Sequence, residues 1–208
     1  MDIAAIAALA PVVPVLTIER LEDAVPLARS LVKGGLRVLE ITLRTDTALE
    51  ALGAIAAQVP DAVVGAGTVL DARQLDQVRQ KGARFAVSPG CTPALAQAAK
   101  ASGLPFLPGV QTVSEAMELS EQGFRLLKFF PADMAGGIGW LKAVAAPLAG
   151  LRFCPTGGVS AETAASYLAL PNVACVGGSW VAPRDAVAAG DWPRIERLAA
   201  AAFQFKLR

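Results

Sequence analysis

Eight short apolar runs, rich in β-branched residues, recur along this chain at a nearly constant spacing. Their starts lie roughly 20 to 26 residues apart, which is the length of one strand–loop–helix–loop unit. Several runs are apolar on both faces, as expected for parallel strands that are covered by helices. The predicted strands are 12–17, 37–43, 62–69, 84–89, 105–110, 126–131, 152–156 and 174–178.

Helix start and stop signals fill the intervals between these runs. Thr112 and Glu115 have the spacing of a capping box. Thr92 followed by Pro93 is typical of an N-cap with proline at the first helical position. Further helix starts and ends are predicted at Asp71, Ser160, Gly34, Gly82, Gly103 and Gly123.

Eight strand–helix units in 208 residues predict an α/β protein, a single (β/α)8 TIM barrel spanning 1–208 with a short N-terminal helix. The alternative is a doubly wound open sheet, but its Gly-rich dinucleotide fingerprint is missing after the first strand. No linker, low-complexity stretch or charge run divides the chain, so we expect one domain.

Composition excludes several classes of partner. The formal charge is only +1, which does not favour a nucleic-acid partner. No apolar run reaches membrane-spanning length, so we expect no membrane span. The apolar start, 3–16, follows Asp2 and contains Pro11 and Pro14, which argues against a targeting segment.

The three cysteines, Cys91, Cys154 and Cys175, are too few and of odd number for a disulfide framework. They are typical of reduced thiols in a cytoplasmic protein. There is no histidine and no CxxC pair, so we expect no metal site.

Lys128 lies inside the apolar run 126–131. A lysine is rarely buried without a partner or a purpose. Desolvation favours a neutral amine, which attacks carbonyls and forms a Schiff base. Because the chain lacks histidine, acid–base chemistry would have to use Glu, Asp, Lys, Tyr, Cys or water.

Strand alternation groups the charged residues. Glu40 and Arg44 share one face of the second predicted strand, and Lys128 lies on one face of the sixth; both faces also carry apolar residues. The opposite face of each strand is wholly apolar and should meet helices. We therefore expect Glu40, Arg44 and Lys128 inside the barrel, near the strand C-termini where barrel active sites form. The same argument places Ala66 there with Thr68. The alternative interpretation of Lys128 is a structural ion pair with Glu40.

Glycine pairs end the last two predicted strands, at 157–158 and 177–178, and each pair adjoins a hydroxyl residue. Glycine lets backbone N–H groups approach an anion closely. Phosphate sites of (β/α)8 enzymes often use the loops after strands seven and eight. The pattern predicts a phosphate site, and tight turns without a ligand are the alternative.

These segments together resemble the bacterial 2-keto-3-deoxy-6-phosphogluconate (KDPG) aldolases, which also act on 4-hydroxy-2-oxoglutarate (KHG). The resemblance covers essentially the whole chain. Its matching segments are 12–15, 38–45, 64–69, 88–90, 128–132, 152–158 and 177–180.

The resemblance implies a class I aldolase that needs no metal or cofactor and forms a homotrimer. Lys128 matches the Schiff-base lysine, and Glu40 matches the general acid–base residue. Residues around the pyruvyl part of the substrate match Arg44, Thr68, Pro89 and Phe130. The phosphate-binding region matches Thr156, Gly157, Gly158, Gly178 and Ser179.

The implied reaction splits KDPG into pyruvate and glyceraldehyde 3-phosphate, and KHG into pyruvate and glyoxylate. Three alternatives stay open from the sequence. They are an aldolase for the galactonate epimer of KDPG, an isomerase or epimerase acting on phosphosugars, and a barrel that binds phosphosugars without catalysis.

Overall fold

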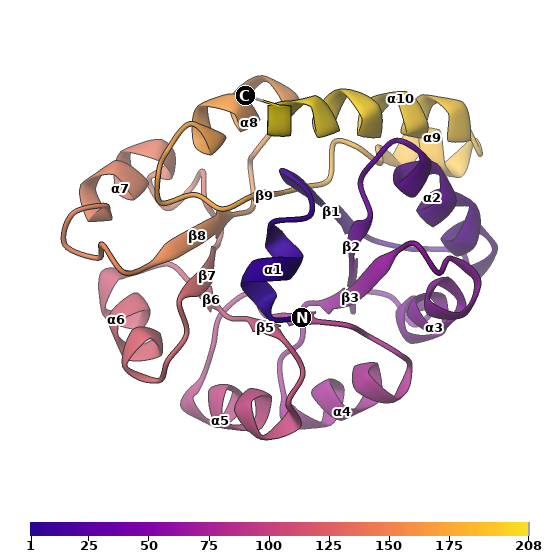
Figure 1. The fold of residues 1–208 in the computed structure, drawn as a ribbon. Coiled ribbons are helices and arrows are strands. Elements are labelled where there is room, and N and C mark those ends of the chain that lie inside the picture. The colour runs from indigo at the N-terminus through magenta and orange to yellow at the C-terminus, as the bar shows by residue number, and fades with distance from the viewer. Residues whose placement is uncertain (208) are drawn as a thin grey trace.

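All eight predicted strand regions form strands in the computed structural model, which describes residues 1–207. Every named pair of strands is parallel, as the two-sided apolar runs indicated. The strands lie in the middle and the helices surround them (Figure 1). The strands are β1 Val12–Leu16, β2 Val38–Thr42, β3 Val63–Gly67, β4 Ala86–Val87, β5 Phe106–Leu107, β6 Gly109–Val110, β7 Leu126–Phe129, β8 Arg152–Pro155 and β9 Val176–Gly178.

The strands form two curled parallel sheets, with orders β5-β4-β3-β2-β1-β9 and β6-β7-β8. The predicted fifth strand is split at Pro108, because proline has no N–H to continue a ladder. Its carbonyl oxygen instead accepts a hydrogen bond from the Lys128 backbone N–H at 2.8 Å. Single bridges from Phe153 to Val173 and from Thr156 to Gly177 connect the two sheets on the other side.

Helices follow the strands in turn and cover their outer faces (Figure 1). The capping box at Thr112 and Glu115 is confirmed, as are the N-caps Asp71 and Thr92. Among residues 1–207, no helix is long and apolar enough to cross a membrane. The helices are α1 Ile3–Ala7, α2 Leu21–Lys33, α3 Ala48–Gln58, α4 Ala72–Gln80, α5 Pro93–Ser102, α6 Val113–Glu121, α7 Gly137–Val144, α8 Ala161–Leu168, α9 Arg184–Ala188, α10 Trp192–Phe203 and the 3-10 helix η1 Gln204–Leu207.

Two apolar clusters pack on opposite faces of the strands. The larger one joins helices to the outer strand faces and includes Leu39, Ile41, Leu127 and Phe129. This confirms that the wholly apolar faces of the second and sixth predicted strands meet the helices. The smaller cluster lies inside the ring of strands and includes Ile6 of α1, which covers one end of that ring (Figure 1).

The prediction for Ala66 is wrong. Ala66 belongs to the cluster that packs against the helices, whereas Gly65 and Gly67 occupy the inner positions of β3. A Cβ at Gly65 would overlap the Phe85 ring, and one at Gly67 would overlap the Glu40 side chain. Thr68 lies just after β3 and has φ of 60°. The alternation of side chains along the strand therefore does not extend to Thr68.

The contact between α2 and α10 depends on Gly34. A Cβ at this position would lie 2.5 Å from the Ala199 Cβ and 2.6 Å from the Glu196 carbonyl oxygen. We expect Gly34→Ala to lower the free energy of unfolding by about 1–3 kcal/mol, since the helices would have to separate. Urea denaturation measures this change.

Gly139 in α7 is the matched control, because a Cβ there would meet nothing within 4 Å. Gly139→Ala should leave stability unchanged or raise it by roughly 0.5–1 kcal/mol, the helix-propensity gain. Equal urea midpoints for Gly34→Ala and the unmodified protein would contradict the close approach of α2 and α10.

Candidate active site

Lys128 is the third residue of β7 and has small neighbours on both adjacent strands. Its register partners are Gly109 on β6 and Cys154 on β8. The strand is held from the helix side by Phe129, whose ring stacks on Trp140 of α7 with centroids 4.2 Å apart. The lysine side chain therefore points to the interior, where only 4% of it is exposed.

Glu40 of β2 meets Lys128 across the interior. The Lys128 Nζ donates a hydrogen bond to the Glu40 Oε1 at 3.0 Å, and the glutamate side chain is also only 4% exposed. The two residues belong to different sheets, so this ion pair joins the sheets through the inside of the ring. The structure thus places both residues together in the interior, as the alternation predicted.

Glycine makes the room for this pair. Any side chain at Gly67 would occupy the position of the Glu40 carboxylate. Gly109 is equally constrained, because a Cβ there would overlap the backbone of Pro89. The Phe130 ring lies 5.4 Å from the Lys128 Nζ, measured to the ring centroid, and gives the ammonium group an aromatic neighbour.

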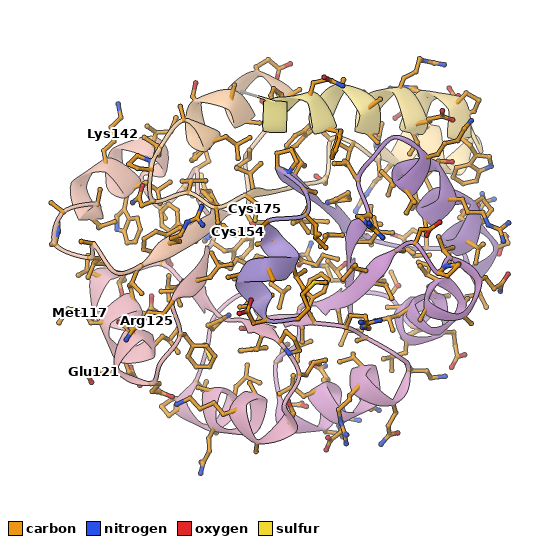
Figure 2. All side chains as sticks on the ribbon, in the orientation of Figure 1. Met117, Glu121, Arg125, Lys142, Cys154 and Cys175 are labelled. Carbon is orange, nitrogen blue, oxygen red and sulfur yellow. The ribbon has the colours of Figure 1, made fainter. Side chains whose placement is uncertain are left out.

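Two buried thiols lie near the ion pair's strand β7, with Cys154 on β8 and Cys175 immediately before β9. Both Cys154 and Cys175 are free, and they belong to the interior cluster (Figure 2). The hydrogen bond between them lowers the pKa of Cys154 and raises that of Cys175. Lys128 also lowers the Cys154 pKa through its positive charge. In the described part of the chain, no group of three or more metal-ligating side chains occurs.

A cavity of about 510 Å³ opens at the C-terminal ends of the strands. Seven residues that the sequence singled out line it, namely Arg44, Phe130, Thr156, Gly157, Gly158, Gly178 and Ser179. Lys128 and Glu40 are not in the lining, but the Lys128 Nζ lies 5.4 Å from the ring centroid of Phe130, which is part of the lining. Thr68 and Pro89 do not line the cavity.

Arg44 is held at one side of this cavity by Thr68. Its Nε donates a hydrogen bond to the Thr68 Oγ1 at 3.3 Å. Thr68 has φ of 60°, which is rare for a β-branched residue and costs of order 1–3 kcal/mol. Such local strain clusters at functional sites, and here it presents a hydroxyl to a guanidinium at the cavity wall.

Glycine-rich turns form the other side of the cavity. Gly157 and Gly158 have φ of 93° and 81°, so both backbone positions favour glycine. A Cβ at Gly158 would overlap Asp133, and one at Gly178 would overlap the Trp180 ring. Because these residues carry no side chains, the cavity wall here is bare backbone.

The lining also contains residues that the sequence analysis did not identify. Thr17 ends the first strand region, and its hydroxyl lies 3.2 Å from that of Thr42. A hydroxyl at a strand end was a usable signal for Thr17. Gly177 also lines the cavity, and it belongs to the glycine pair at 177–178 from which a phosphate site was predicted. The remaining additions had no such signal, and they are Val15, Val159, Trp180, Ala182, Pro183 and Arg184.

Comparison with known proteins assigns the family. The family model described as "KDPG and KHG aldolase" matches residues 3–198. The KHG/KDPG aldolase of Escherichia coli K12 is 53% identical over 189 residues, which cover 91% of this chain and 89% of that protein.

Solved structures agree with this match. The KDPG aldolase of Legionella pneumophila, with pyruvate captured at low pH as a covalent carbinolamine, has a TM-score of 0.96 and 47% identity, covering 98% of each chain. That of Zymomonas mobilis ZM4, with 3-phosphoglycerate, has a TM-score of 0.93 and 48% identity, covering 98% of this chain and 96% of that one. The chain belongs to the KDPG and KHG aldolase family.

Proposed function

We propose that this protein is a class I aldolase that cleaves KDPG to pyruvate and glyceraldehyde 3-phosphate, and KHG to pyruvate and glyoxylate. The observation that carries the proposal is the buried contact between the Lys128 Nζ and the Glu40 Oε1 at 3.0 Å. It supplies a nucleophile and a proton acceptor at one point in the interior. The names of the relatives support the substrate class.

The first step needs a neutral amine. The Lys128 ammonium already donates a hydrogen bond to Glu40, so transfer of that proton gives an amine and a carboxylic acid without bringing in another base. The amine nitrogen then attacks the C2 ketone of the substrate and forms a carbinolamine. Glu40 returns its proton to the departing hydroxyl group, water leaves, and a protonated imine remains on Lys128.

Carbon–carbon cleavage uses the same two residues. The Glu40 carboxylate removes the proton of the C4 hydroxyl as the C3–C4 bond breaks. The bonding electrons move to the imine, which becomes an enamine, and the aldehyde leaves. Protonation of the enamine and hydrolysis of the resulting imine release pyruvate and restore the lysine.

The cavity fits a substrate that is charged at both ends. Arg44, held by Thr68, lies where it can bind the carboxylate next to C2. Apolar contacts to the pyruvyl part are proposed for Phe130 and Pro89. The phosphate would lie against the glycine-rich turns and hydroxyls, at Thr156, Gly157, Gly158, Gly178 and Ser179. Binding energy at the phosphate would position C4 near Glu40.

The finer features of fold and assembly are also proposals. We propose that the curled sheets form a single (β/α)8 TIM barrel domain over 1–208, whose last residue lies outside the described residues. The single bridges from Phe153 to Val173 and from Thr156 to Gly177 support this. A cytoplasmic homotrimer is proposed from the family resemblance, and the three free cysteines suit a reducing compartment. Sedimentation equilibrium at three times the chain mass would support the trimer, and a monomer or dimer would overturn it.

Borohydride reduction in the presence of pyruvate tests the imine. We expect a pyruvate-derived adduct on Lys128, located by intact mass and peptide mapping, because reduction makes the carbon–nitrogen bond permanent. Lys128→Ala should form no adduct and show no measurable aldol cleavage while it remains folded. Lys142→Ala removes an exposed lysine on α7 and serves as the control that keeps both adduct and turnover (Figure 2). An adduct on another lysine would sink this mechanism.

Glu40→Gln tests the proton relay. We expect kcat for KDPG cleavage to fall by about 10²–10⁴-fold, the usual contribution of general acid–base catalysis. Steady-state kinetics with both KDPG and its galactonate epimer would measure this loss and define which epimer is preferred.

Gly67→Ala gives a second test, in which Glu40 is still present but is moved from its position. Its methyl group would displace that carboxylate, so kcat should fall by roughly 10²-fold, the scale of a 1 Å misplacement. If both variants kept kcat near that of the unmodified protein, the acid–base role would belong to another group.

A further inference from the structure

Arg184 lines the cavity but has no part in the mechanism above. It is the first residue of α9 and is exposed. The chain turns between Ser179 and Ala182, where the Ala182 N–H donates to the Ser179 carbonyl oxygen at 3.1 Å. This turn brings Arg184 back to the same cavity that Gly178 and Ser179 line.

The charges around the cavity are all of one sign. Among the residues that the structure describes, Arg44 and Arg184 are the charged ones in the lining, and no Asp or Glu lines the cavity. Arg44 is already bonded to Thr68. The Arg184 guanidinium has no hydrogen-bond or ion-pair partner within 1–207, and the adjacent Asp185 pairs instead with Arg194 at 2.6 Å.

We propose that Arg184 is a specificity-determining residue, which binds the terminal phosphate of the substrate and favours phosphorylated over unphosphorylated 2-keto acids. The inference rests on the proposed function and deepens it. An unpaired guanidinium at the rim supplies planar N–H donors whose geometry matches phosphate oxygens. It also carries a positive charge, whereas backbone N–H groups alone do not neutralise the negative charge of a phosphate. Because it acts far from the broken bond, its main effect should be on KM and not on kcat.

The experiment compares Arg184→Ala and Arg184→Lys on KDPG and KHG. For Arg184→Ala we expect the KM for KDPG to rise about tenfold, the scale of one charge-assisted hydrogen bond to an exposed group, with kcat within about twofold. The KM for KHG should change much less. Arg184→Lys should recover part of the loss, since it keeps the charge without the fork of donors.

Inorganic phosphate provides a second readout. It should compete with KDPG for the phosphate site, and Arg184→Ala should raise its inhibition constant by about the same factor as the KM for KDPG. Arg73→Ala is the matched control. Arg73 is exposed near the start of α4, has no hydrogen-bond or ion-pair partner among residues 1–207, and does not line the cavity. Its removal should change neither value.

Ser179→Ala separates the possible failures. If it weakens KDPG binding selectively while Arg184→Ala does not, the phosphate site stands and the inference for Arg184 is overturned. Equal losses on KDPG and KHG in Arg184→Ala would also overturn it, because they would indicate a structural role. If the unmodified protein cleaves neither substrate, the proposed function itself fails.

Discussion

The buried ion pair between Lys128 and Glu40 is the interaction around which the interior is built. Removing two charges from water costs several kcal/mol for each ion, and their attraction offsets this only with good geometry. At 3.0 Å and 4% exposure, the pair is weak evidence for stability. A pair of well-packed apolar residues would join the two sheets equally well. Its presence beside a cavity is explained better by chemistry, because the proton that the pair shares is the one an imine reaction has to move.

The space around this pair depends on what its neighbours lack. Gly67 leaves space for the Glu40 side chain, and Gly109 adds no side chain next to Lys128. Cys154 is the small partner on the other side of Lys128. The interior of a parallel barrel is normally filled by branched side chains. Here the small residues concentrate on strands next to the charged ones, so they leave room in the interior for the ion pair.

Periodicity predicted the strands and helix caps because each depends on residues close in sequence. It also placed Lys128 and Glu40 inside, since their opposite strand faces are wholly apolar. It failed at Ala66, because the glycines of β3 leave no apolar pattern from which to tell inside from outside. It predicted a single fifth strand over 105–110, which the structure divides at Pro108, where a missing N–H interrupts the pairing. The position of Arg184 depends on a turn that closes through backbone hydrogen bonds, for which no side-chain pattern exists.

The two arginines of the cavity differ in how they are held, and this difference fits the roles that we propose for them. Arg44 is tied to Thr68, whose backbone strain is of order 1–3 kcal/mol, so a carboxylate bound there would be fixed relative to Lys128. Arg184 is exposed and unpaired within the described residues 1–207. A free guanidinium loses side-chain entropy on binding but can follow phosphates at slightly different distances. Under the proposed function, Arg44 held by Thr68 and an adaptable Arg184 at the rim would let substrates of different length share the pair of Lys128 and Glu40.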